Sequence, residues 1–325
     1  MDAIELRNLT KIYGNRNIAL SGVNLNVPQG SVFGLIGPNG AGKTTTFKLL
    51  LGLQRPTGGS AVVFGEQMTP NSGRLRSRIG YLPTNPRFPK DMTPIGYLDL
   101  MGRLSGLPRE LRKTRLANLL RAVDLLPAAS QNLQALSTGM TTRLGIAASL
   151  LHDPDLLIWD EPTSGLDPAG RRFMLDLIRS LTGKKTLIVS THLLGDVDRV
   201  CDYVGVLSEG KLVFSGPVSE MKRLAHQNEV EIETQSDLTA LENTLERWGN
   251  GRVEFTLADP HTLHVRFSDK ESFTSQLAGL LQFLSQQSIE ILSLRSASDQ
   301  LESAFLDRLE EERTHGFTRA MELEE

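Results

Sequence analysis

The first thirty residues alternate apolar and polar side chains. Val23, Leu25 and Val27 fall on one face of an extended segment, with polar residues between them. This period of two predicts strands that bury one face and expose the other. We therefore expect hairpin-like, antiparallel strands joined by turns over residues 1–30.

Compact apolar runs farther along the chain are typical of buried strands. They occupy residues 31–37, 156–160 and 186–190. Residues 44–53 and 92–126 instead carry apolar side chains at three- and four-residue spacing, which predicts helices. Arg and Lys lie opposite the leucines of 92–126, and a solvated helix face explains them more simply than a binding patch. The alternation of strand and helix predicts a mostly parallel α/β sheet.

A second, smaller domain is predicted after Gly216 and Pro217, where the pattern changes. The order there is strand, helix, two strands, helix and strand, followed by a closing helix near 299–313. Its role remains open between dimer contact, regulation and folding stability. The predicted domains are residues 1–225, residues 226–310 as a small α/β accessory domain, and a flexible tail at 311–325.

Composition narrows the class of protein. A chain of 325 residues is long enough for one large and one small domain. With 35 Lys and Arg against 38 Asp and Glu, the net charge of -3 argues against a nucleic-acid partner. The single cysteine, Cys201, suits a reducing, cytosolic compartment. Neither a secretory signal nor an apolar run of about 18 residues is found, so a membrane role requires another chain.

A phosphate-binding loop lies between the first apolar run and the helix predicted after it. Residues 37–44 fit the pattern G-x-x-x-x-G-K-[ST], whose glycines let backbone N–H groups approach phosphates at a helix N-terminus. Lys43 can reach the β and γ phosphates, and the Thr44 hydroxyl can ligate Mg²⁺. We predict nucleotide binding by Gly37, Pro38, Asn39, Gly40, Ala41, Gly42, Lys43, Thr44 and Thr45.

Two acids end the run at 156–160. Asp160 suits the Mg²⁺ shell, usually through water, and Glu161 is placed to polarise the water that attacks the γ-phosphate. Adjacent carboxylates can also simply cap a strand. The phosphate loop favours the functional interpretation, with Lys43 and Glu161 as catalytic residues and a nucleotide and Mg²⁺ as substrate and cofactor.

Residues 136–147 read LSTGMTTRLGIA, which resembles the signature motif of ATP-binding cassette (ABC) ATPases. The resemblance runs through residues 1 to about 220. In this family the signature of one cassette caps the γ-phosphate held by another, so that two ATP molecules lie in a head-to-tail dimer. The resemblance implies that Ser137 and Gly139 contact nucleotide. An N-cap role for Ser137 is compatible with that function.

Four further residues are implied by the same resemblance. Tyr13 is similar to the aromatic residue that stacks on adenine, and Asp167 to the loop that communicates across the dimer. His192 resembles the switch histidine that contacts the γ-phosphate and orients water. Thr84 stands where the family usually has a Gln in the Mg²⁺ shell. Its side chain is shorter, although its hydroxyl can act through a bridging water.

The whole layout resembles bacterial multidrug, antibiotic and natural-product export ATPases. This implies an α/β phosphate-loop core with an antiparallel β subdomain, a helical subdomain at about 92–150 and the small C-terminal α/β domain. It also implies an ATPase coupled to transport, a separate transmembrane permease and a second cassette, with a homodimer expected. The expected location is cytoplasmic, peripheral on the inner face of the cell membrane. The alternatives are a soluble ABC-type ATPase and a weakly hydrolysing regulatory module.

Overall fold

The computed structural model describes residues 2–14, 17–224, 229–267 and 273–296. The chain packs as two compact units, Met1–Val218 and a second that begins at Ser219. The expected domain boundary near residue 226, the closing helix and the tail lie outside the described residues.

An antiparallel sheet opens the first unit, with strand order β2-β1-β4-β5. Val23, Leu25 and Val27 of β2 are buried, and β1 pairs with β2 in antiparallel register. The predicted hairpin is therefore confirmed, with longer strands than the sequence pattern suggested. The strands are β1 (Asp2–Tyr13), β2 (Asn17–Pro28), β4 (Gly58–Val63) and β5 (Glu66–Gln67).

The main sheet has the order β10-β9-β3-β8-β7-β6. Neighbours from β9 to β6 are parallel, and only β10 pairs in the antiparallel sense. This confirms the predicted mostly parallel sheet. The strands are β3 (Val32–Ile36), β6 (Ile79–Leu82), β7 (Leu156–Asp160), β8 (Thr186–Thr191), β9 (Tyr203–Ser208) and β10 (Lys211–Pro217).

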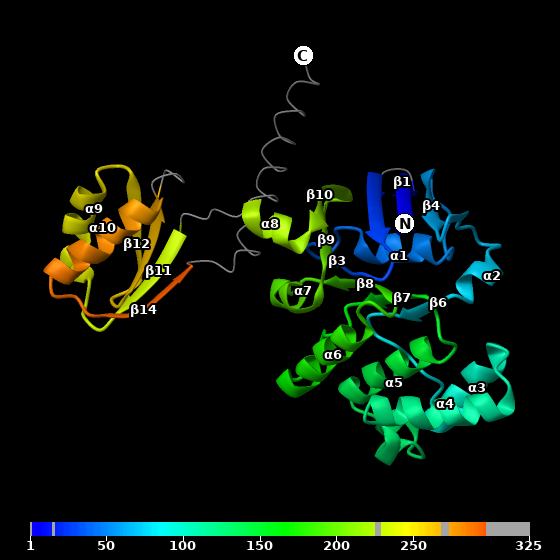
Figure 1. The fold of residues 1–325 in the computed structure, drawn as a ribbon. Helices are drawn as coiled ribbons and strands as arrows, with labels where there is room; N and C mark the ends of the chain where they lie inside the picture. Colours follow the sequence, from blue (N-terminus) through cyan, green and yellow to red (C-terminus); the bar gives the residue numbers. More distant parts are fainter. Residues whose placement is uncertain (1, 15–16, 225–228, 268–272, 297–325) are drawn as a thin grey trace. The chain divides into compact units, whose positions relative to one another are not determined.

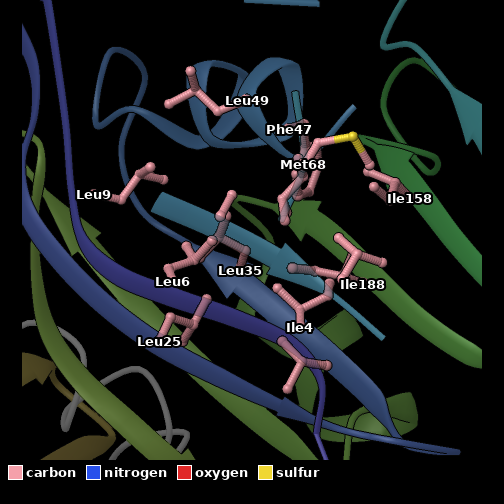
Figure 2. Packing of buried hydrophobic residues seen from close by; sticks show 14 of the residues in the cluster. Ile4, Leu6, Leu9, Leu25, Leu35, Phe47, Leu49, Met68, Ile158 and Ile188 are labelled. Atoms are coloured by element: carbon pink, nitrogen blue, oxygen red, sulfur yellow. The ribbon is translucent and has the colours of Figure 1, made fainter. Parts of the chain in front are cut away.

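One hydrophobic cluster joins the two sheets and α1 (Lys43–Leu50), as Figure 2 shows. Leu6 comes from the antiparallel sheet, Leu35 and Ile188 from the main sheet, and Phe47 from α1. Because β3 and α1 both contribute to this cluster, the loop between them is held at both ends.

The helical segment predicted at 92–126 forms two helices, α3 (Pro94–Leu104) and α4 (Arg109–Ala122). Gly106, with φ near +72°, and Pro108 end the helical pattern between them. With α5 (Thr138–Leu150), they gather beside the β6–β7 edge of the sheet (Figure 1). The other helices described before residue 225 are α2 (Gly73–Arg76), α6 (Pro168–Leu181), α7 (Leu194–Val200) and α8 (Val218–Leu224), with short 3-10 turns at Leu126–Ala128 and Leu133–Ala135.

The described part of the second unit follows the predicted element order. Its four strands pair antiparallel in the order β12-β13-β11-β14, an arrangement typical of ferredoxin-like β-α-β-β-α-β folds. After α8, its elements are β11 (Glu229–Thr234), a 3-10 turn (Thr239–Leu241), α9 (Glu242–Gly249), β12 (Val253–Asp259), β13 (Thr262–Phe267), α10 (Phe273–Gln286) and β14 (Ile291–Ser296). Across all described residues of the chain, no helix has the length and apolar character needed to span a membrane.

Candidate functional site

The loop between β3 and α1 adopts backbone angles that favour glycine. Gly40 has φ near +86° and Gly42 near +108°. A Cβ on Gly42 would lie 2.6 Å from Leu20 Cδ2 and 2.7 Å from the Ala19 carbonyl oxygen. Gly42 directly precedes the first residue of α1, so the loop wraps tightly onto the positive end of a helix.

A pocket of about 290 Å³ opens over this loop. Besides the loop, Thr84 and the two acids at the end of β7 contribute to it, so three parts of the predicted site that are far apart in the sequence meet here. The lining residues are Ala19, Pro38, Asn39, Gly40, Ala41, Gly42, Lys43, Thr44, Thr45, Thr84, Asp160 and Glu161.

Lys43 is almost fully buried at the base of the loop, with 7% of its surface exposed. Its Nζ donates hydrogen bonds to the carbonyl oxygens of Gly37, at 2.6 Å, and Pro38, at 3.2 Å. The same Nζ lies 3.6 Å from Glu161 Oε1. The ammonium therefore places a positive charge where phosphates would meet the loop, facing a carboxylate.

The Thr44 hydroxyl and the Asp160 carboxylate lie within hydrogen-bond distance of each other. The Thr44 hydroxyl donates to Asp160 Oδ2 at 2.9 Å, and Asp160 is 1% exposed. Burial, and secondarily the negative charge of Asp160, raises the pKa of Tyr81 to about 12. Tyr81 is therefore an uncharged phenol near neutral pH.

Glu161 takes a left-handed backbone conformation, with φ near +53°. Such a conformation is strained for a residue with a side chain and persists only where its surroundings enforce it. Its Oε2 lies 2.9 Å from Nδ1 of His192, which follows β8 and is half exposed. The carboxylate is thus held between the Lys43 ammonium on one side and the His192 ring on the other.

Ser190 is a site residue that the sequence analysis missed. Its hydroxyl donates to Asp160 Oδ1 at 2.5 Å and accepts the Glu161 N–H at 2.9 Å. The only sequence signal was a hydroxyl near the end of the apolar run at 186–190, which by itself suggests an ordinary buried strand residue. The Ser190 hydroxyl reaches the acids only because β8 lies beside β7 in the sheet.

Four of the residues implied by the resemblance lie away from this pocket. Ser137 caps α5 by accepting the Met140 N–H at 3.2 Å, and Gly139 follows in the first turn. Asp167 caps α6 by accepting the Gly170 N–H at 3.0 Å. The Tyr13 hydroxyl donates to Gln54, and the Lys11 Nζ lies 5.1 Å from the centroid of the Tyr13 ring. Within the described residues, none of the four lines the pocket over the loop.

The amino-acid sequence is similar to known transport proteins. The family model described as "ABC transporter" matches residues 20–164. The chain is 34% identical over 308 residues to the daunorubicin/doxorubicin resistance ATP-binding protein DrrA of Streptomyces peucetius, covering 94% of this chain and 91% of DrrA. It is 34% identical over 306 residues to the bacitracin transport ATP-binding protein BcrA of Bacillus licheniformis, covering 93% and 96%.

Two further comparisons each cover about two thirds of the chain. A Nod factor export ATP-binding protein of Cupriavidus pinatubonensis is 39% identical over 214 residues, covering 66% of this chain and 66% of that relative. Among solved structures, one described as the ATP-binding subunit of an ABC transporter superposes with a TM-score of 0.63 and 30% identity. The superposition covers 68% of this chain and 92% of the chain in that solved structure.

Proposed function

Because this chain belongs to the ATP-binding subunits of ABC transporters, we propose that it hydrolyses ATP to power export through a separate membrane permease. The observation that carries the proposal is the convergence of Lys43, Asp160 and Glu161 on one pocket over the phosphate loop. Export as the direction is supported by the likeness to a Nod factor export protein and to DrrA, a resistance protein.

We assign the chemistry to three side chains. Glu161 is the general base that takes a proton from the attacking water, since its carboxylate lines the pocket and is held there by its contact with His192. His192 orients that carboxylate through the 2.9 Å contact between Nδ1 and Oε2. Lys43 supplies positive charge to the phosphates as negative charge develops on the transferring phosphoryl group.

Thr44 and Asp160 fit a Mg²⁺ site. Mg²⁺ prefers oxygen ligands and commonly uses one or two protein groups together with phosphate oxygens and water. The Thr44 hydroxyl and the Asp160 carboxylate are such groups, 2.9 Å apart and both at the pocket. When bound, Mg²⁺ neutralises charge on the β and γ phosphates. Thr84 lines the same pocket, and we assign its hydroxyl a contact through a bridging water.

A second cassette supplies the other half of each ATP site in this proposal. Ser137, Gly139 and Asp167 lie at the starts of α5 and α6, away from the pocket of their own chain. The N-terminus of α5 carries N–H groups and the positive end of a helix dipole, which suit a γ-phosphate. We therefore assign these residues to the nucleotide of a second copy in a head-to-tail dimer, and Tyr13 to the adenine of its own chain.

The test is the Mg²⁺-dependent ATPase rate of the purified full chain, measured over a wide range of protein concentration. Because two copies complete each site, we expect the rate to rise faster than linearly with concentration until the dimer saturates. A rate strictly proportional to concentration would contradict the need for a second copy. Absence of Mg²⁺-dependent turnover, with ATP binding retained, would instead favour the weakly hydrolysing regulatory module.

The permease is expected to contact the helical subdomain. Leu100 and Leu104 of α3 lie one turn apart and are 39% and 73% exposed. Exposed apolar side chains grouped on one helix face often mark a protein contact. We therefore propose that the permease docks against α3 and the segment after Thr84, which would place this chain on the cytoplasmic face of the membrane.

Replacing Leu104 with aspartate is expected to release the permease, because a carboxylate would replace an apolar contact. The measurement is co-purification of the full chain with a polytopic protein from detergent-solubilised native membranes. Leu53→Asp is the matched control, since Leu53 is 62% exposed but lies outside the helical subdomain. We expect Leu104→Asp to lower the affinity for the co-purified membrane protein at least tenfold, which corresponds to about 1.4 kcal/mol of binding energy, and Leu53→Asp to leave this affinity unchanged. Equal recovery of both variants would rule out docking through Leu104.

A further inference from the structure

Ser190 contacts both acids of the site through one hydroxyl. Its Oγ donates to Asp160 Oδ1 at 2.5 Å and accepts the Glu161 N–H at 2.9 Å. We infer that Ser190 is a positioning residue that sets the orientation of the metal-binding carboxylate and of the general base together. This inference rests on the proposed function, because it takes the roles of Asp160 and Glu161 from it.

The two oxygens of Asp160 have different partners. Oδ2 accepts from the Thr44 hydroxyl, on the phosphate loop side, and Oδ1 accepts from Ser190 on β8. The terminal torsion of an aspartate is broad, so backbone position alone does not fix the carboxylate plane. With a donor at each oxygen, the plane is fixed, and Oδ2 remains beside the Thr44 hydroxyl.

The backbone of Glu161 depends on the same hydroxyl. Its N–H is shared between Ser190 Oγ, at 2.9 Å, and the Ser190 carbonyl oxygen, at 3.2 Å. The shorter of these two contacts is the one to the side chain. Since Glu161 holds a strained φ near +53°, the contacts that anchor its N–H help to keep the carboxylate aimed at the pocket.

A purely structural role predicts a different pattern of hydrogen bonds. Ser149 shows that pattern, because its hydroxyl donates to the Ile146 carbonyl of its own helix and accepts from Trp159 Nε1. Both serines are buried and both bond to β7 or to the residue just after it. Only Ser190 directs its side-chain bonds to the two acids. Ser149 is therefore a matched control for loss of a buried hydroxyl.

Removing the Ser190 hydroxyl is expected to weaken metal binding and slow chemistry together. Groups that hydrogen-bond a metal-ligating side chain typically affect metal affinity or activity by about 10- to 100-fold, and we expect Ser190→Ala to fall in this range. The KM for ATP should change by less than about threefold, because the phosphate loop itself is untouched. Ser190→Thr should recover most of both losses, since it retains the hydroxyl.

The experiment compares Ser190→Ala, Ser190→Thr and Ser149→Ala in the full chain. Mn²⁺ affinity in the presence of a non-hydrolysable ATP analogue is measured by electron paramagnetic resonance, alongside kcat, KM and the thermal midpoint. Ser190→Cys is a further variant that keeps the side-chain volume but bonds weakly, and it should behave like Ser190→Ala. This variant keeps the test decisive if threonine is too large for the buried site.

The inference is supported if the Mn²⁺ affinity falls in Ser190→Ala and Ser190→Cys but is unchanged in Ser149→Ala. It is overturned if Ser190→Ala binds Mn²⁺ like the parent chain, or if Ser149→Ala shows the same loss. A parent chain without ATPase activity would count against the proposed hydrolysis. The Mn²⁺ measurement would still decide the role of Ser190, because it requires no turnover.

Discussion

Replacing Glu161 with glutamine is expected to lower the ATP turnover number by at least about 100-fold, the usual contribution of a general base. Glutamine has nearly the same shape but cannot accept a proton from water at neutral pH. Binding of ATP should persist, because Lys43 and the phosphate loop remain in place. The measurement is kcat together with the equilibrium affinity for ATP, both in the full chain with Mg²⁺.

The same variant should accumulate as an ATP-bound dimer, because hydrolysis is the step proposed to reopen the interface. Size-exclusion chromatography with and without ATP detects that species. Glu66→Gln is the control, since Glu66 is exposed on β5 and its replacement changes the net charge equally. ATP turnover by Glu161→Gln at the parent rate would remove Glu161 as the base.

The phosphate loop and the acid pair could be predicted because each is a short, continuous stretch of sequence. The loop at 37–44 carries its own glycines, and Asp160 and Glu161 end an apolar run whose strand is buried throughout. Their meeting at one pocket follows from a general property of parallel sheets, whose carboxyl ends collect functional residues. The family and the α/β fold predicted on these residues are confirmed by the relatives and the solved structure.

Ser190 could not be predicted because its role depends on the order of strands. The sequence shows that the run at 186–190 is a buried strand but not that it lies between β3 and β7. Only that neighbour relation places a hydroxyl of β8 against the end of β7. Strand order is set by pairing between residues far apart in the chain, which local periodicity does not encode.

The break between α3 and α4 shows a different limit. Leucines recur at helical spacing from 92 to 126, and this spacing predicts helices without giving the position of the break between them. Gly106 and Pro108 interrupt the helical pattern. The buried Arg112 of α4 then forms an ion pair with Asp99 of α3, with Nε 2.5 Å from Oδ1. That ion pair joins the two helices and lowers the pKa of Asp99, chiefly through the hydrogen bond from Arg112. Such a contact is visible only once the chain has folded back.

Replacing Lys43 with methionine is expected to lower kcat/KM for ATP by about 100- to 1000-fold, the usual cost of losing one group that stabilises transition-state charge. Methionine retains most of the apolar stem, which is buried, but it removes the ammonium that faces the pocket. The Gly37 and Pro38 carbonyls also lose their donor, so the loop loses two contacts that organise it.

Lys48→Met controls for the loss of a positive charge from the same helix, since Lys48 lies in the last turn of α1 and does not line the pocket. Steady-state kinetics at fixed Mg²⁺, with ATP affinity measured separately, distinguish the two variants. We expect Lys48→Met to retain the parent kcat/KM within about threefold, as is usual for a substitution away from the site. If Lys43→Met and Lys48→Met lost activity equally, general electrostatic attraction of ATP would explain the effect. A specific role for Lys43 requires that kcat/KM fall in Lys43→Met and not in Lys48→Met. The decrease should lie mainly in kcat, because Lys43 stabilises charge that develops in the transition state.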